Sequence, residues 1–219
     1  MTGAVLVAAI LGAVFGFAAD RLSSRWPLHE DEHLRGLDWR TAAVTLAGGG
    51  ALAALTWRWS DPLDLLVLGV YVAALIVLLA TDLDQKLLPD LITFPLMGYA
   101  LLVLLTGLNP VLAGKTQVFI AEGDLSALLA AVAAPALLAV TDRLFRGALG
   151  LGDLKLAVSL GLMFGVTQLF AGFLVGTIAF AAIVLALVLG RRVSMKTAVP
   201  FGPALIAAGV AAAVMAPPA

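Results

Sequence analysis

Apolar runs about as long as a bilayer is thick recur along the whole chain, and this feature limits its possible folds most strongly. A hydrocarbon core of about 30 Å needs roughly 20 apolar residues as a helix. Eight such runs are predicted as spans, at about 3–19, 41–57, 63–81, 91–107, 125–141, 154–167, 169–190 and 198–216. The break between the sixth and seventh, near Gly165 to Gln168, is the least sharply marked. We expect an all-α polytopic membrane protein in which residues 1–219 form one membrane-embedded domain with short loops.

Composition supports lipid as the solvent and narrows the kinds of site. Hydrophobic residues make up 62% of the 219 residues and charged residues 12%, against roughly 45–50% and about 25% in soluble domains. A net charge of -1 argues against a nucleic-acid partner bound by a basic face. The chain has no cysteine, which excludes disulfides, thiolate metal sites and cysteine nucleophiles.

The segments between the predicted spans divide the basic residues unequally. With the N-terminus outside, two of the 13 basic residues, Arg58 and Lys115, fall in outer segments. The other basic residues fall in cytoplasmic segments: Arg21, Arg25, Arg35, Arg40, Lys86, Arg143, Arg146, Lys155, Arg191, Arg192 and Lys196. Because Lys and Arg accumulate in cytoplasmic loops, this bias predicts eight spans with the N-terminus outside. Small residues inside the spans, such as Ala47 to Ala51, indicate close helix packing rather than a phosphate site.

Two aspartates lie where apolar spans meet cytoplasmic segments. Asp82 follows the third span and Asp153 begins the sixth. Carboxylates at the ends of apolar spans are costly and need a reason. The predicted topology puts both on the cytoplasmic side, where two acids from distant parts of the chain could face each other at one membrane depth.

A pair of close carboxylates has a definite chemical use. Two such groups do not both ionise easily, so one holds a proton while the other is charged. The charged member can take a proton from water, and the protonated member can polarise a scissile carbonyl. Titration belongs to the pair, so the sequence does not say which aspartate starts charged.

The neighbouring residues suit this role and also a purely structural one. Gly150 and Gly152 permit close backbone approach, and Pro89 ends any helix that runs through Asp82. Alternatively, Asp153 is an N-cap and Asp82 a solvated loop acid. The residues alone leave both interpretations open.

Several strings resemble the bacterial type IV prepilin peptidase family, a member of the GxGD group of intramembrane aspartyl peptidases. They are Asp82-Leu83-Asp84 followed by Leu88-Pro89-Asp90 and Thr93, then Gly150-Leu151-Gly152-Asp153-Leu154-Lys155-Leu156, and finally Pro200-Phe201-Gly202-Pro203. The opening stretch 12–22 is also similar to the first span of that family. The resemblance covers nearly the whole chain in the expected order.

The resemblance implies that Asp82 and Asp153 are the two catalytic acids. Asp84 is the nearest competitor for the first role, because it lies two residues further on. The residues that complete the motifs are Gly150, Gly152, Lys155 and Pro89. The implied activity is removal of the short basic leader from type IV prepilins or pseudopilins, at the cytoplasmic side of a prokaryotic plasma (inner) membrane, with no cofactor needed for proteolysis.

The sequence departs from this family in one place. Many bacterial members also methylate the new N-terminus with S-adenosylmethionine, and these carry a larger, often zinc-binding region after the first span. Here that region is only Asp20 to Arg40 and has no cysteine. We therefore expect no thiolate zinc site and no methyltransferase activity; S-adenosylmethionine would be required only if methylation were retained.

Three other interpretations compete. The stretch His29-Glu30-Asp31-Glu32-His33 fits the HExxH zinc protease motif, but it lies in a short acidic loop, so His29 and His33 are weak metal-ligand candidates and a solvated loop is favoured. A proton-coupled transporter also uses paired membrane acids, though nearer mid-membrane. An inactive homologue that acts only in assembly would not need both aspartates and both glycines.

Overall fold

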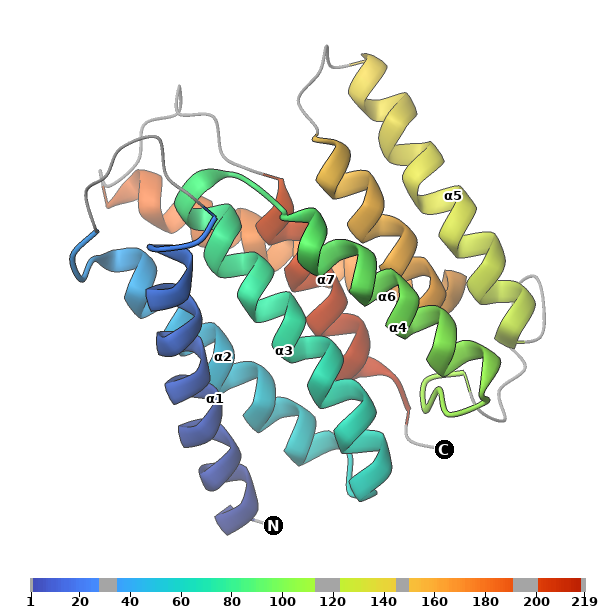
Figure 1. Ribbon diagram of the computed structural model, residues 1–219, viewed down its shortest axis with the longest axis horizontal. Helices are drawn as coiled ribbons and strands as arrows, with labels where there is room; N and C mark the ends of the chain where they lie inside the picture. The colour runs from blue at the N-terminus through green and yellow to red at the C-terminus, as the bar shows by residue number, and fades with distance from the viewer. Residues whose placement is uncertain (1, 28–34, 113–122, 145–149, 191–200, 218–219) are drawn as a thin grey trace.

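The computed structural model describes residues 2–27, 35–112, 123–144, 150–190 and 201–217, and these contain helices and no strand. Seven helices follow in order: α1 (Thr2–Ser23), α2 (Trp39–Arg58), α3 (Pro62–Gln85), α4 (Asp90–Leu105), α5 (Gly123–Leu144), α6 (Leu151–Leu189) and α7 (Gly202–Met215). Figure 1 shows most of them running between the same two ends of the molecule. The predicted all-α fold is thus confirmed for this part of the chain.

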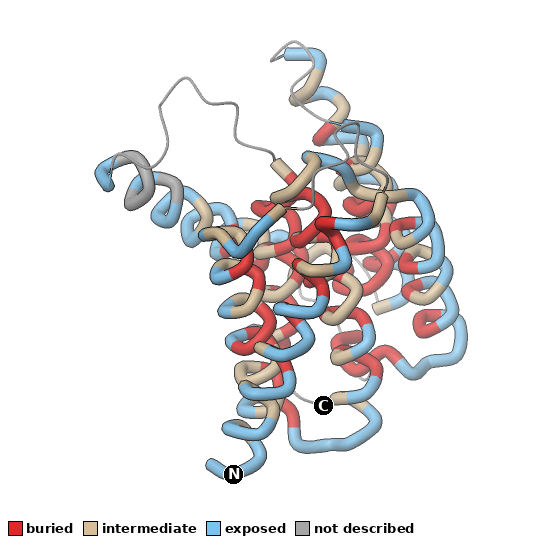
Figure 2. The backbone as a smooth tube through the Cα atoms, turned by 60° about the vertical axis from the view of Figure 1, so that its left-hand side comes forward, coloured by how far each residue is buried: buried red, intermediate tan, exposed pale blue. Residues whose placement is uncertain are grey.

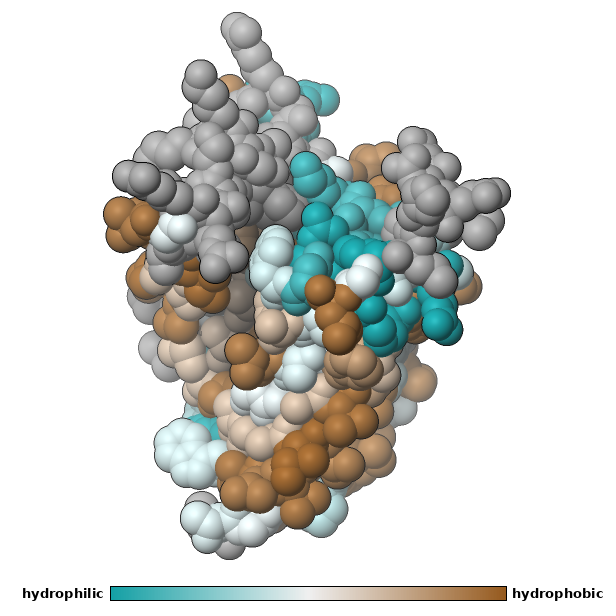
Figure 3. All heavy atoms as spheres, turned by 90° about the vertical axis from the view of Figure 1, so that its left-hand side faces the viewer, coloured by the Kyte–Doolittle hydropathy of each residue, from teal (hydrophilic) through white to brown (hydrophobic). Residues whose placement is uncertain are grey.

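The outer faces of the helices suit a lipid environment. In the described ranges, α1, α3, α5 and the 151–183 part of α6 are long and apolar enough to cross a membrane, and α4 and α7 are shorter apolar helices. Large side chains such as Leu46, Leu105 and Phe170 are more than 70% exposed. Figure 2 shows buried residues inside the bundle and exposed ones outside, and Figure 3 shows one face that is hydrophobic below and hydrophilic towards its upper end. Exposed leucines in such numbers indicate a lipid-facing surface.

Glycines bring α1 and α2 into close contact. A Cβ on Gly12 or Gly16 would overlap the backbone of α2 at Gly48 and Val44, and a Cβ on Gly48 would overlap Gly12. The backbones approach this closely because no side chain separates them. The close packing predicted from the small residues 47–51 is therefore confirmed.

Local chemistry sets where α3 and α4 begin and end. Asp61 accepts hydrogen bonds from two backbone N–H groups of the first turn of α3, and Pro62 occupies its first helical position. The helix ends at Gln85 because Lys86 adopts a left-handed conformation (φ 56°). Pro89 then precedes the first residue of α4. The predicted restart after Pro89 is confirmed, but α3 already ends four residues before the proline.

The break predicted near residue 165 lies at Gly165, whose φ of 64° and ψ of -178° are non-helical inside α6. The break frees backbone groups, and buried side chains from other segments satisfy two of them. Asn109 Nδ2 donates to the carbonyl of Met163 (2.9 Å), and Ser126 Oγ accepts from the N–H of Val166 (3.0 Å). Such compensation is what a break at membrane depth requires.

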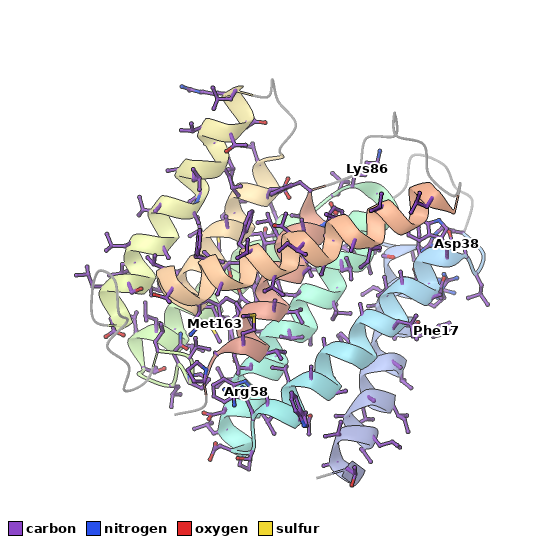
Figure 4. The ribbon with its side chains drawn as sticks, turned by 180° about the vertical axis from the view of Figure 1, so that it is seen from behind. Phe17, Asp38, Arg58, Lys86 and Met163 are labelled. Atoms are coloured by element: carbon purple, nitrogen blue, oxygen red, sulfur yellow. The ribbon has the colours of Figure 1, made fainter. Side chains whose placement is uncertain are left out.

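The stretch labelled α6 therefore consists of two helices that meet at Gly165, and the two predicted spans 154–167 and 169–190 correspond to them, with the break a few residues earlier than predicted. Figure 1 shows the second part turning away from α5 and crossing the molecule behind α3, and Figure 4, seen from the opposite side, shows it in front. Figure 4 also shows Lys86 and Asp38 towards one end of the molecule and Arg58 towards the opposite end. This is the separation that the predicted topology requires of these three residues.

Candidate active site

Asp82 lies in the last turn of α3 and is buried, with 4% of its surface exposed. Its backbone carbonyl accepts the N–H of Lys86 (2.9 Å) at the end of the helix. Within the described residues, its buried Oδ2 atom has no hydrogen-bond partner. An unsatisfied buried polar atom costs about 1–3 kcal/mol, so Asp82 destabilises the fold and is not the solvated loop acid of the structural alternative.

Asp153 lies in the first turn of α6 and is 8% exposed. Its Oδ2 atom accepts a hydrogen bond from the backbone N–H of Gly150 (2.9 Å). The side chain thus reaches back to the residue before the helix, as the third helical residue does in a capping box. The N-cap interpretation was close, but Asp153 caps from inside the helix and not from the residue that precedes it.

The structure brings these two aspartates from distant parts of the chain to one end of the bundle. Gly152, the residue before Asp153, packs against Leu88 in the connection that follows α3, so the end of α3 and the start of α6 meet. Helix α7 closes the same region, since a Cβ on Gly202 would lie 2.6 Å from Asp82 Oδ2 and 2.7 Å from its Cγ. The arrangement provides two buried carboxylates at the meeting point of three helices.

The connection between α3 and α4 packs against the start of α6. A Cβ on Gly152 would lie 2.8 Å from Leu88 Cβ and 3.3 Å from the Leu88 carbonyl oxygen. Glycine at this position permits the contact, whereas a Cβ on Gly150 would meet only Asp153 Oδ2 at an ordinary 3.5 Å. The two strings that the sequence singled out therefore meet, with the turn before Pro89 lying beside Asp153.

An ion pair holds the same two segments together. Lys155 Nζ lies 2.5 Å from Asp90 Oδ1 and 4.6 Å from the ring centroid of Phe94. Lys155 belongs to the start of α6, and both of its partners belong to the first turns of α4. Lys155 thus links the start of α6 to the start of α4.

Asp84 has a different environment from Asp82. Its Oδ1 atom lies 2.8 Å from Arg35 Nε and 3.2 Å from Arg40 Nη1, and its side chain is 3% exposed. Arg35 also pairs with Asp20 (2.5 Å), which is fully buried at the end of α1. Asp84 therefore ties α3 to the α1–α2 region.

The start of α2 completes this network. Asp38 caps α2 through a capping box and pairs with Arg35. Burial acts against its charge, but the ion pair with Arg35 and two backbone N–H groups of α2 hold the pKa of Asp38 below its usual value. The charged residues here pair with one another, and these ion pairs involve neither Asp82 nor Asp153.

The proposed zinc sites find no support in the part of the chain that the structure describes. Its residues contain no group of three His, Cys, Asp or Glu side chains that could hold a metal. His29, Glu30 and His33 lie outside the described residues. Because the chain has no cysteine, it has no ligands for a thiolate zinc site.

Two features of this region were missed by sequence reasoning. Gly202 was noted only as part of a recurrent string, although it is the residue that contacts the Asp82 carboxylate. The pairing of Asp84 with Arg35 and Arg40 was also missed. The string around Gly202 was a usable signal for its contact with Asp82. No sequence signal indicated the pairing of Asp84 with the two arginines, because the partners are about 45 residues apart in the chain.

Fold and site together define a class: a helical membrane-type bundle with two buried aspartates at the adjoining ends of α3 and α6. The model of the type IV leader peptidase family matches residues 69–190, which include both aspartates and both motif glycines. The chain belongs to the type IV leader peptidase family.

Similar proteins agree with this assignment. A protein of Bacillus subtilis (strain 168) named prepilin leader peptidase/N-methyltransferase is 29% identical over 170 residues, covering 78% of this chain and 64% of that protein. A protein of Aeromonas hydrophila with the same name is 32% identical over 194 residues, covering 86% of this chain and 57% of that protein. The chain thus spans about three-fifths of the length of these curated relatives. No solved structure gives a significant match. The transporter and zinc protease alternatives gain no support from these comparisons.

Proposed function

We propose that this protein is a membrane aspartyl endopeptidase that removes the leader peptide from type IV prepilins or pseudopilins. One observation carries the proposal: Asp82 and Asp153 are both buried, and the end of α3 and the start of α6 that carry them meet at one end of the bundle in a chain of the leader peptidase family. The names of the relatives supply the substrate class.

The two carboxylates suffice for the chemistry. One accepts a proton from water as the water oxygen attacks the carbonyl carbon of the scissile peptide bond, and the other donates a hydrogen bond to the carbonyl oxygen. The tetrahedral intermediate then breaks its C–N bond, and the amine leaves with a proton from the pair. Because each proton taken is returned, the pair is restored and no cofactor is needed.

The proposed membrane arrangement has eight passes, with the N-terminus outside and the two aspartates at the cytoplasmic side of a prokaryotic plasma membrane. Two observations support it. Lys86 and Asp38 lie towards one end and Arg58 towards the other (Figure 4), as the distribution of basic residues predicts. The kink at Gly165 lets the two parts of α6 serve as two passes. A substrate helix in the membrane would then present its bond at the level of the two aspartates.

Methyltransferase activity is a separate matter, although the relatives' names include it. Methylating members carry a larger, often zinc-binding region after the first span. In this chain the corresponding segment is only residues 20–40, and it has no cysteine. We therefore propose proteolysis without methylation. Incubation of the cleaved product with S-adenosylmethionine, followed by mass spectrometry of the new N-terminus, tests this, and a gain of one methyl group would refute it.

The primary test is cleavage of a prepilin-like peptide by purified protein in detergent. We expect cleavage by the unaltered protein to persist with a strong zinc chelator and to vanish in Asp82→Asn and in Asp153→Asn, because each variant removes one acid–base group worth roughly 10²–10⁴-fold in rate.

Gel filtration and thermal unfolding provide the control, since both variants should fold normally. Cleavage lost to the chelator but retained in Asp153→Asn would move the site to His29, Glu30 and His33. Absence of cleavage in the unaltered protein, with several prepilin leaders tried, would reject the peptidase function.

A further inference from the structure

The first turn of α7 contains a contact that the proposed chemistry does not explain. Gly202 is the first residue of α7, a helix of 14 residues, and its α-carbon lies against the Asp82 carboxylate. A Cβ at this position would come within 2.6 Å of Oδ2, 2.7 Å of Cγ and 3.0 Å of Oδ1. Every atom of the carboxylate group therefore packs against the place where any other residue would carry its side chain.

Glycine is needed here for space and not for backbone conformation. The positive-φ glycines in the described ranges are Gly107 and Gly165, and Gly202 is not among them. Alanine would therefore suit the backbone at Gly202 without strain and is the better helix former. The contact with Asp82 therefore explains why this position is a glycine.

The Asp82 side chain has little free space into which it could move away from α7. Its neighbours Ala80 and Thr81 are buried, and the residue itself is 4% exposed. Its Oδ2 atom is unpartnered among the described residues and faces the N-terminal end of α7. That end of a helix carries a partial positive charge and favours a negative group beside it. A methyl group at Gly202 would push the carboxylate away from this place and change its distance to Asp153.

We propose that Gly202 is a positioning residue for Asp82, and that α7 thereby sets the relative placement of the two carboxylates. The activity measurement that tests this inference rests on the proposed peptidase function. The inference predicts that a displacement of about 1 Å lowers turnover without weakening peptide binding, since misplacement on this scale can cost about 100-fold.

The test compares Gly202→Ala with Gly209→Ala, a matched control in the same helix. A Cβ on Gly209 would meet Leu160 Cδ2 at 2.7 Å and Leu75 Cδ1 at 2.8 Å, the ends of flexible side chains. We expect Gly202→Ala to lower kcat by about 10- to 100-fold with KM within about twofold, and to shift the pH dependence of kcat. Gly209→Ala should keep kcat within about threefold and the pH dependence unchanged. Equal effects of the two variants, or a kcat of Gly202→Ala within about threefold of the unaltered protein, would overturn the inference.

A stability cycle tests the contact without reference to activity. Gly202→Ala is compared in the unaltered protein and in an Asp82→Ala background, where the carboxylate is gone. We expect Gly202→Ala to lower the apparent Tm by about 5 °C in the first case and by less than about 2 °C in the second. Equal shifts in both backgrounds would show that Gly202 does not act through Asp82. Failure of the unaltered protein to cleave any prepilin peptide would reject the proposed function and leave this cycle as the test of the contact.

Discussion

Asp82 and Asp84 lie two residues apart, and exchanging each for asparagine should have opposite effects on stability and activity. Asp84 pairs with Arg35 and Arg40, whereas Asp82 has an unpartnered Oδ2 atom among the described residues. Asparagine keeps the volume of either side chain, removes its charge and replaces one acceptor oxygen by an NH2 donor. The two variants therefore separate an acid that stabilises the fold from one that reacts.

The cost of Asp84→Asn follows from its surroundings. Breaking a buried ion pair costs about 3–5 kcal/mol, but Arg35 keeps Asp20 and Asp38 as partners, and its side chain is 17% exposed. A cost of about 1–3 kcal/mol is then expected, which corresponds to an apparent Tm lowered by about 3–9 °C in a chain of this size. Turnover should fall less than about tenfold, because the reacting carboxylates keep their places.

Asp82→Asn should behave in the reverse way. It replaces a buried acid whose Oδ2 atom has no partner in the described residues by a neutral side chain, so the apparent Tm should be unchanged or raised by a few degrees. Activity should be lost, because a group that carries a proton in the reaction is gone. Stabilisation by removal of a functional group is a known trade-off at active sites.

The assay measures both quantities on the same preparations: thermal unfolding in detergent and cleavage of a prepilin-like peptide. Asp90→Asn provides a matched control, because that carboxylate lies near the site but is 60% exposed. The reasoning is refuted if Asp84→Asn abolishes cleavage with an unchanged Tm, since Asp84 would then be the reacting acid.

Three further predictions follow from the described contacts. Asp20→Asn should lower the apparent Tm by about 5 °C or more in thermal unfolding, because the fully buried Asp20 pairs with two arginines at the end of α1. Asn109→Ala should cost about 1–3 kcal/mol and speed proteolysis near Gly165, because it leaves the Met163 carbonyl at the kink without its donor; limited proteolysis with mass spectrometry checks this. Lys155→Met should reduce kcat by less than about tenfold with little change in Tm, because a partly exposed ion pair contributes about 0–1 kcal/mol, and steady-state kinetics measures the effect.

The positions of the helices could be predicted because apolar length is a direct physical requirement. The predicted span 63–81 lies within α3 (Pro62–Gln85), and the predicted span 91–107 overlaps α4 (Asp90–Leu105). The end of α3 was placed too early because a hydropathy pattern stops at the first polar residue. The helix itself continues through Asp82 and Asp84, and it ends where Lys86 turns left-handed.

The site could be predicted only in part. The strings around Asp82 and Asp153 indicated the two acids, and the structure places both at one end of the bundle. The contact of Gly202 with Asp82 and the pairing of Arg35 with Asp84 depend on which helix faces meet. Spacing along the chain does not determine this, because neighbours on different helices are set by packing of the whole bundle.

Helix geometry explains why two aspartates so close in the sequence have different surroundings. Residues two apart on a helix point about 200° from each other. Asp82 therefore faces α7 at Gly202, while Asp84 faces the opposite side of α3, where Arg35 neutralises it. On the first side, one carboxylate oxygen is buried without a partner in the described residues, which lowers stability. A shift of one residue in the register of α3 would turn both acids away from these surroundings. The rotation of α3, set by its packing against α1, α2 and α7, is thus what gives the two aspartates their different surroundings.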